Sequence, residues 1–133
     1  LRPDLDGLEW LRENGYRTVL HLRRPGEEAT ADRRLIERKG LRYVGITVDA
    51  DAFDPAAIEA FNRVAADASA RPLFVYDRDG VLSGSLWYAH FRTAGGLPEG
   101  EARLRAGRLG LKEQGNAEQA ALWVTIQRHL QGR

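Results

Sequence analysis

The chain has 133 residues, of which 43% are hydrophobic, so it is long enough for one buried core and too short for two. Twenty basic residues against nineteen acidic ones leave a net charge of +1, which argues against nucleic acid or an anionic membrane surface as a partner. No apolar run approaches the roughly 20 residues that are needed to span a bilayer. We therefore expect a soluble, cytoplasmic domain.

The sequence contains neither methionine nor cysteine. Without a methionine the chain cannot begin at a start codon, so we expect one domain over residues 1–133 that is part of a longer protein. The lack of cysteine excludes disulfides, thiolate metal sites and cysteine nucleophiles. Because His21, His90 and His129 follow no metal-binding spacing, we predict neither a metal nor a cofactor.

Helical and β patterns alternate along the chain. We predict helices over residues 4–14, 27–39, 55–68, 83–93, 99–108 and 116–130, and strands over residues 17–23, 41–48 and 73–76. Asp54 followed by Pro55 predicts an N-cap with proline at the first helical position. The unbroken apolar run Leu73–Tyr76 predicts a central strand that is buried on both faces.

This order of elements is typical of the α/β class. Strands that alternate with helices form a mostly parallel central sheet that is flanked by helices in a three-layer arrangement. The loop Asp77 to Ser83 leaves the end of the strand Leu73–Tyr76 and runs directly into the next helix. Free backbone N–H groups and the helix dipole converge at such a position, so we predict that this loop is the site of the domain.

The loop reads Tyr76-Asp-Arg-Asp-Gly-Val-Leu-Ser-Gly84. In cysteine-dependent phosphatases the corresponding loop reads His-Cys-x-x-Gly-x-x-Arg followed by Ser or Thr. Four further segments match the patterns of bacterial dual-specificity and tyrosine phosphatase-like proteins, namely Pro3 to Leu11, Val19 to Glu28, Gly40 to Val48, and Trp87 in the helix after the loop. Nearly the whole chain thus resembles this family, which implies a protein tyrosine phosphatase-like fold.

The resemblance also implies a mechanism whose main parts are missing. In the family a cysteine thiolate attacks phosphorus, an arginine and backbone N–H groups stabilise the charge, and an upstream aspartate protonates the leaving oxygen. Here Asp77 occupies the nucleophile position and Ser83 the arginine position, while Asp49 or Asp51 lies where the acid would be. We therefore expect a catalytically inactive pseudophosphatase that serves as a regulatory or protein-binding module.

The charges of the loop favour the same interpretation. Asp77 and Asp79 would repel a phosphate dianion, and we expect no arginine to offset them. The backbone N–H groups of the loop could instead be satisfied by these two carboxylates as an internal cap. The candidate anion loop consists of Asp77, Arg78, Asp79, Gly80, Val81, Leu82 and Ser83.

A second motif overlaps the same residues. Phe74 to Leu82 resembles the D-x-D-G-V-L signature of magnesium-dependent phosphatases of the haloacid dehalogenase type. That resemblance implies Asp77 as nucleophile, Asp79 as acid and base, and a metal ion that neutralises their charge. Against it, that family carries the motif on its first strand and needs a later lysine and acidic pair. This chain offers only Lys112 after the motif.

Overall fold

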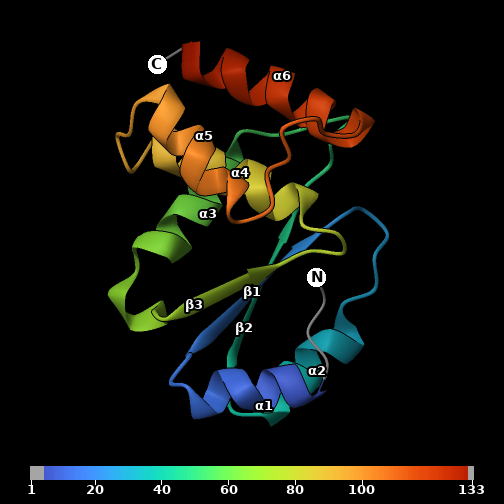
Figure 1. Cartoon of the computed structure of the whole chain (residues 1–133). Helices are drawn as coiled ribbons and strands as arrows, with labels where there is room; N and C mark the ends of the chain where they lie inside the picture. The colour runs from blue at the N-terminus through green and yellow to red at the C-terminus, as the bar shows by residue number, and fades with distance from the viewer. Residues whose placement is uncertain (1–4, 132–133) are drawn as a thin grey trace.

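The computed structural model describes residues 5–131 (Figure 1). In chain order the elements are α1 (Leu5–Glu13), β1 (Thr18–Arg23), α2 (Thr30–Arg38), β2 (Arg42–Thr47), α3 (Ala56–Ala66), the 3₁₀ turn η1 (Ala68–Ala70), β3 (Leu73–Tyr76), α4 (Val81–Arg92), α5 (Glu99–Gly107) and α6 (Ala117–Gln131). The predicted elements are all present in this range. None of the helices in residues 5–131 has the length and apolar character needed to cross a bilayer.

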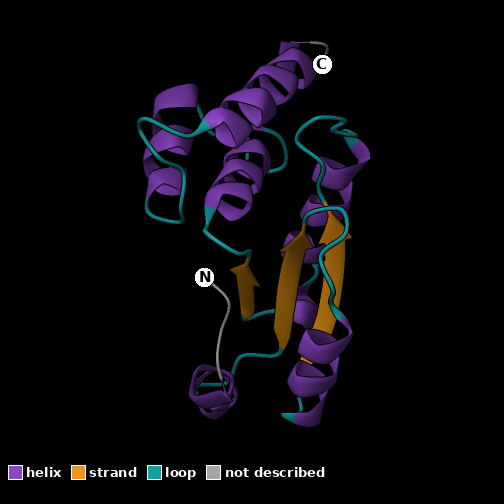
Figure 2. Ribbon diagram, turned by 90° about the vertical axis from the view of Figure 1, so that its right-hand side faces the viewer, coloured by secondary structure: helices purple, strands orange, loops and turns teal. Residues whose placement is uncertain are grey.

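The three strands of the described residues form one parallel sheet in the order β2-β1-β3 (Figure 2). β1 lies in the centre, where His21 pairs with Gly45 on one side and with Tyr76 on the other. The prediction that Leu73–Tyr76 is the central strand is therefore wrong, because this strand is at the edge and its first three residues are only half-buried. The strand that is buried throughout is β1, from Thr18 to Leu22.

Helices cover both faces of the sheet, as predicted for the three-layer α/β class. Alternate residues of β1 point to opposite sides, so Val19 joins the core under α1 and α2, whereas Leu20 and Leu22 join the core under α3 to α6. Figure 1 shows α1 and α2 on one side of the strands and α3 to α6 on the other. The second core is larger and continues between the helices α4, α5 and α6.

Several helices begin at other residues than predicted, because side chains near their starts bind backbone N–H groups. α3 begins at Ala56 after Pro55, and the Asp54 carboxylate accepts the Ala56 N–H at 2.9 Å. Before α2, Glu27 and Glu28 lie in the segment that follows the turn at Pro25 and Gly26, where they accept the N–H groups of Arg24 and Thr30 at 2.8 and 2.6 Å. Asp4, the first residue of the predicted first helix, and Pro3, the first residue of the segment Pro3 to Leu11, lie outside the described residues.

Gly84 allows α4 to pack directly against the turn that follows α5. A Cβ atom at this position would lie 2.0 Å from the backbone nitrogen of Leu111 and 2.4 Å from the carbonyl carbon of Gly110. Because a backbone segment would have to move, we expect Gly84→Ala to lower the free energy of unfolding by about 3 kcal/mol in urea denaturation. Gly100→Ala is the control, since a Cβ there meets nothing within 4 Å and should change stability by about 1 kcal/mol or less. Equal losses in the two variants would contradict the packing argument.

Candidate functional site

Three segments meet at the end of the sheet where the carboxyl ends of its parallel strands lie. Arg24 follows β1, Val48 and Asp49 follow β2, and Asp77 follows β3. Parallel strands place the segments that follow them side by side, and ligands of such sheets bind at this end. The predicted loop therefore lies beside the turn after β1 and the acidic segment after β2.

The loop between β3 and α4 is shorter than predicted. It comprises Asp77 to Gly80, and Gly80 has a φ of +87°, a left-handed conformation that glycine adopts without steric cost. α4 therefore begins at Val81 rather than at Ser83. Val81, Leu82 and Ser83 form the first turn of this helix, and all three are buried.

Two carboxylates occupy the N-terminus of α4. Asp77 is fully buried, and its two oxygens accept the N–H groups of Leu82 and Ser83, each at 3.1 Å. Asp79 accepts the N–H of Val81 at 3.1 Å. The predicted internal cap is confirmed.

The cap binds three of the N–H groups that the start of α4 leaves without a partner inside the helix. Such groups are the ones that bind an anion at a helix N-terminus. The N–H groups of Val81, Leu82 and Ser83 bind Asp79 and Asp77, and the N–H of Gly84 makes the first bond within the helix, to the Gly80 carbonyl at 3.0 Å. An incoming phosphate would have to displace a buried carboxylate to reach these groups.

Arg24 supplies a positive charge to the loop. Its Nη2 atom lies 3.0 Å from Asp79 Oδ1 and 3.6 Å from Asp77 Oδ2. The same guanidinium donates two hydrogen bonds to Glu118 at the start of α6, from Nε at 2.7 Å and from Nη2 at 2.5 Å. The expectation that no arginine offsets the two aspartates is therefore wrong. Arg24 directly follows β1, so it lies at the same end of the sheet as the loop, and only 10% of its side chain is exposed.

Arg24, Asp77, Asp79 and Glu118 together form a charged cluster, and the protonation states of Arg24 and the two aspartates depend on these contacts. The hydrogen bonds to Glu118 raise the pKa of Arg24, so that it stays charged although burial acts in the opposite direction. Burial raises the pKa of Asp77 despite its two backbone donors. Burial also acts on Asp79, but the Val81 N–H and Arg24 outweigh it and lower the pKa of this more exposed carboxyl group.

Asp49 and Asp51 lie at the rim of a small hollow beside this cluster. The hollow has a volume of about 340 Å³, and Arg24 and Glu118 are among its other lining residues. The Asp49 carboxylate accepts the N–H of Asp51 at 2.9 Å, which stabilises the turn after β2. Both predicted acid candidates are thus near Arg24, whereas Arg78 of the loop is exposed to solvent.

The same cluster bears on the magnesium hypothesis. Within residues 5–131, no group of three or more histidine, aspartate or glutamate side chains is placed to hold a metal ion. The guanidinium of Arg24 already occupies the position of a cation next to Asp77 and Asp79. Both oxygens of Asp77, the nucleophile of that hypothesis, are used by backbone donors.

Residues 2–122 match the model of a protein family described as "DSP-PTPase phosphatase fused to NAD+ Kinase". The chain belongs to this family. A curated relative of this DSP-PTPase domain is NAD kinase 2, chloroplastic, from Arabidopsis thaliana, with 32% identity over 92 residues. The match covers 65% of this chain and 9% of that protein, so the domain spans less than a tenth of its relative.

Solved structures show the same fold at low sequence identity. The DSP-PTPase domain is similar to a putative phosphatase (DUF442) from Shewanella putrefaciens CN-32, with a TM-score of 0.71, 16% identity, and 96% of this chain and 83% of that chain covered. It is also similar to TpbA from P. aeruginosa (TM-score 0.68, 16% identity, 97% and 82% covered). The core catalytic domain of the PP-IP phosphatase SIW14 from S. cerevisiae is a third neighbour (0.70, 12%, 98% and 83%). The predicted tyrosine and dual-specificity phosphatase-like fold is confirmed.

Two members of the cluster in this DSP-PTPase domain could not be assigned to the site from the sequence alone. Because Arg24 follows a strand, the sequence allows it to lie on the same face as the loop or in a solvated turn, and the structure places it beside the loop. Glu118 lies 94 residues further along the chain at the start of a helix, where an acidic residue is common. No local pattern pairs these two side chains.

Proposed function

We propose that this domain does not hydrolyse phosphate esters and acts as a binding or regulatory module within a longer protein. The observation that carries the proposal is the internal cap: Asp77 and Asp79 bind the N–H groups of Val81, Leu82 and Ser83. These are the groups of a helix N-terminus that would otherwise bind an anion. The cap supports a loop that is stable without a ligand.

The chemistry of the loop supports the same proposal. A phosphatase of the cysteine type needs a thiolate and an arginine, and the corresponding positions hold the buried Asp77 and the buried Ser83. Arg24 brings a positive charge, but its guanidinium is already bound by Glu118 and Asp79. The side chain that could attract a phosphate is therefore neutralised by carboxylates.

The family and the plant relative favour a kinase as the partner. The matching family is described by a fusion with NAD+ kinase, and the Arabidopsis relative is named as an NAD kinase. We therefore extend the proposal to a domain that binds or regulates an NAD kinase region, either within its own chain or in a separate one. A change in NAD kinase activity when the domain is removed from its full-length protein, or is added to a separate kinase, would test this extension.

The absence of hydrolysis is tested with purified domain and a generic aryl phosphate. We expect no turnover above the uncatalysed rate, and no rise of the melting temperature with millimolar phosphate or sulfate, because Asp77 and Asp79 already bind the N–H groups of Val81, Leu82 and Ser83. Turnover that is lost in Asp77→Asn would overturn the proposal. Turnover that requires magnesium, together with a thermal shift by magnesium alone, would establish the aspartate-nucleophile phosphatase in its place.

A further inference from the structure

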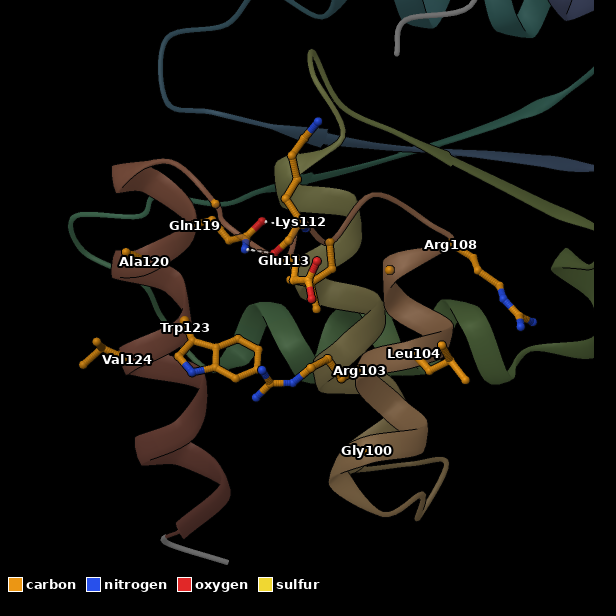
Figure 3. Close-up of a pocket in the computed structure, with 13 residues that line it drawn as sticks. Gly100, Arg103, Leu104, Arg108, Lys112, Glu113, Gln119, Ala120, Trp123 and Val124 are labelled. Atoms are coloured by element: carbon orange, nitrogen blue, oxygen red, sulfur yellow. Dashed lines mark hydrogen bonds between the residues drawn. The ribbon is translucent and has the colours of Figure 1, made fainter.

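A groove lies between α5 and α6 (Figure 3). Both helices pack on α4, and the space between them has a volume of about 770 Å³, within the size range of ligand-binding pockets. It is lined by α5, by the segment from Leu111 to Gly115 and by α6. The loop between β3 and α4 does not line this groove.

The lining of the groove combines apolar surface with positive charge. Leu104 on α5 and Val124 on α6 are 58% and 55% exposed, and the half-buried Trp123 adds apolar area. Figure 3 shows Trp123 and Arg103 pointing toward one another from α6 and α5, and the guanidinium carbon lies 4.8 Å from the centroid of the indole ring. Such a wall offers both packing and cation–π contacts.

The charges of the lining are unbalanced. Three lining residues are basic, Arg103, Arg108 and Lys112, and one is acidic, Glu113. Arg103 donates a hydrogen bond to Glu99, which does not line the groove. Since no salt bridge within residues 5–131 engages Arg108 or Lys112, the groove carries excess positive charge.

Two glycines of α5, Gly100 and Gly107, lie on the side of the helix that lines the groove. A Cβ atom on Gly100 or Gly107 would meet nothing within 4 Å, so internal packing does not require a glycine at either position. Both glycines line the groove. Small residues along a helix let a second helix approach closely, and two helices that rest on a third leave a groove of the kind that amphipathic helices fill.

We propose that the groove between α5 and α6 binds a helical segment of a partner protein that presents apolar side chains flanked by aspartate or glutamate. The apolar side chains contact Leu104 and Trp123, and the acidic ones pair with Arg108 and Lys112. The inference rests on the proposed function in one respect, that the domain acts by binding a protein. It identifies the surface and the chemistry of that partner.

The experiment is a selection from an unbiased library of peptides of about 15 residues, which is above the length below which even helix-forming peptides are marginally helical in water. The library is panned against the domain after depletion on the Leu104→Asp variant. We expect enriched peptides with apolar residues three and four positions apart and with an excess of Asp and Glu. No enrichment, or enrichment of neutral or basic sequences, would overturn the proposal.

Variants then locate the binding of an enriched synthetic peptide. Leu104→Asp and Ala120→Asp place a negative charge in the groove and should weaken binding about tenfold or more, which corresponds to about 1.4 kcal/mol. Leu109→Asp is the matched control, because Leu109 is 43% exposed but does not line the groove, and its binding should stay within about twofold. Arg108→Glu with Lys112→Glu should weaken binding and reduce its salt dependence. Circular dichroism verifies that each variant is folded.

The outcomes distinguish a failure of the proposed peptide binding in the groove from a failure of the proposed absence of hydrolysis. Peptide binding that is equally sensitive to Leu109→Asp and Leu104→Asp would contradict the groove and leave the proposed absence of hydrolysis intact. Self-association of the domain that is abolished by Leu104→Asp would also overturn the inference, since the occupant would then be a second copy. Aryl phosphate turnover combined with groove-specific peptide binding would refute the inactivity alone.

Discussion

Replacing Arg24 with alanine is expected to lower the free energy of unfolding by about 3 kcal/mol, because removal of one partner leaves buried or half-buried charges without compensation. Glu118 would lose both of its hydrogen bonds from the guanidinium, and Asp79 would lose its ion pair. Asp77, which is fully buried, would lose the nearest positive charge, at 3.6 Å. Urea denaturation at neutral pH measures the loss.

Two controls make this prediction specific to the buried cluster. Arg105→Ala removes an arginine from a comparable pair with Glu101, but both side chains are about half exposed, so the loss should be about 0.5 kcal/mol or less. In a double-mutant cycle, Arg24→Ala combined with Glu118→Gln should be less destabilising than the sum of the two single variants. Additive losses would show that the pair is not coupled and would contradict the geometry described for it.

Asp77→Ala is expected to cost a similar amount, about 3 kcal/mol. The substitution leaves the N–H groups of Leu82 and Ser83 buried without an acceptor, and each such group costs about 1–3 kcal/mol. Asp54→Ala is the control, because Asp54 also accepts one N–H at a helix start but is exposed, and its loss should be about 1 kcal/mol or less. Comparable losses for both aspartates would show that burial of the cap contributes little.

The pH dependence of stability provides a second measurement on Asp77. Its folded pKa is raised by burial, so the folded state holds the proton more tightly than the unfolded state does. The stability from this group is complete below the unfolded pKa of about 4 and is lost as the pH rises through the raised folded pKa. The difference in unfolding free energy between the wild type and Asp77→Asn should therefore shrink from pH 4 to pH 8. A difference that grows with pH would mean that the folded pKa of Asp77 is lowered.

The parts of the site that depend on neighbours in sequence could be predicted. The carboxylate of Asp79 reaches an N–H two residues ahead, and that of Asp77 reaches N–H groups five and six residues ahead, so the loop sequence alone indicates the cap. The class of the fold could also be predicted, since apolar periodicity determines which segments become strands and helices. Element boundaries were less accurate, because Glu27 and Glu28 stabilise a turn before α2 that helical periodicity does not reveal.

The order of strands and the long-range ion pairs could not be predicted. Leu73–Tyr76 has the apolar composition of a central strand, yet Thr18–Leu22 fills the centre, and composition does not distinguish these two positions. The bond between Arg24 and Glu118 joins segments 94 residues apart and forms only when the sheet edge and α6 are brought together. The charge balance of the loop is therefore a property of the tertiary structure.

The cap at the start of α4 also bears on how this domain can evolve. A single change that puts cysteine at position 77 would remove the acceptor of two buried N–H groups and the buried carboxylate that lies 3.6 Å from the Arg24 guanidinium. Such a variant would be less stable, and Ser83 would still provide no arginine for a cysteine-type site. Acquisition of a cysteine-type active site thus requires several changes together, and selection for folding alone would favour the capped loop.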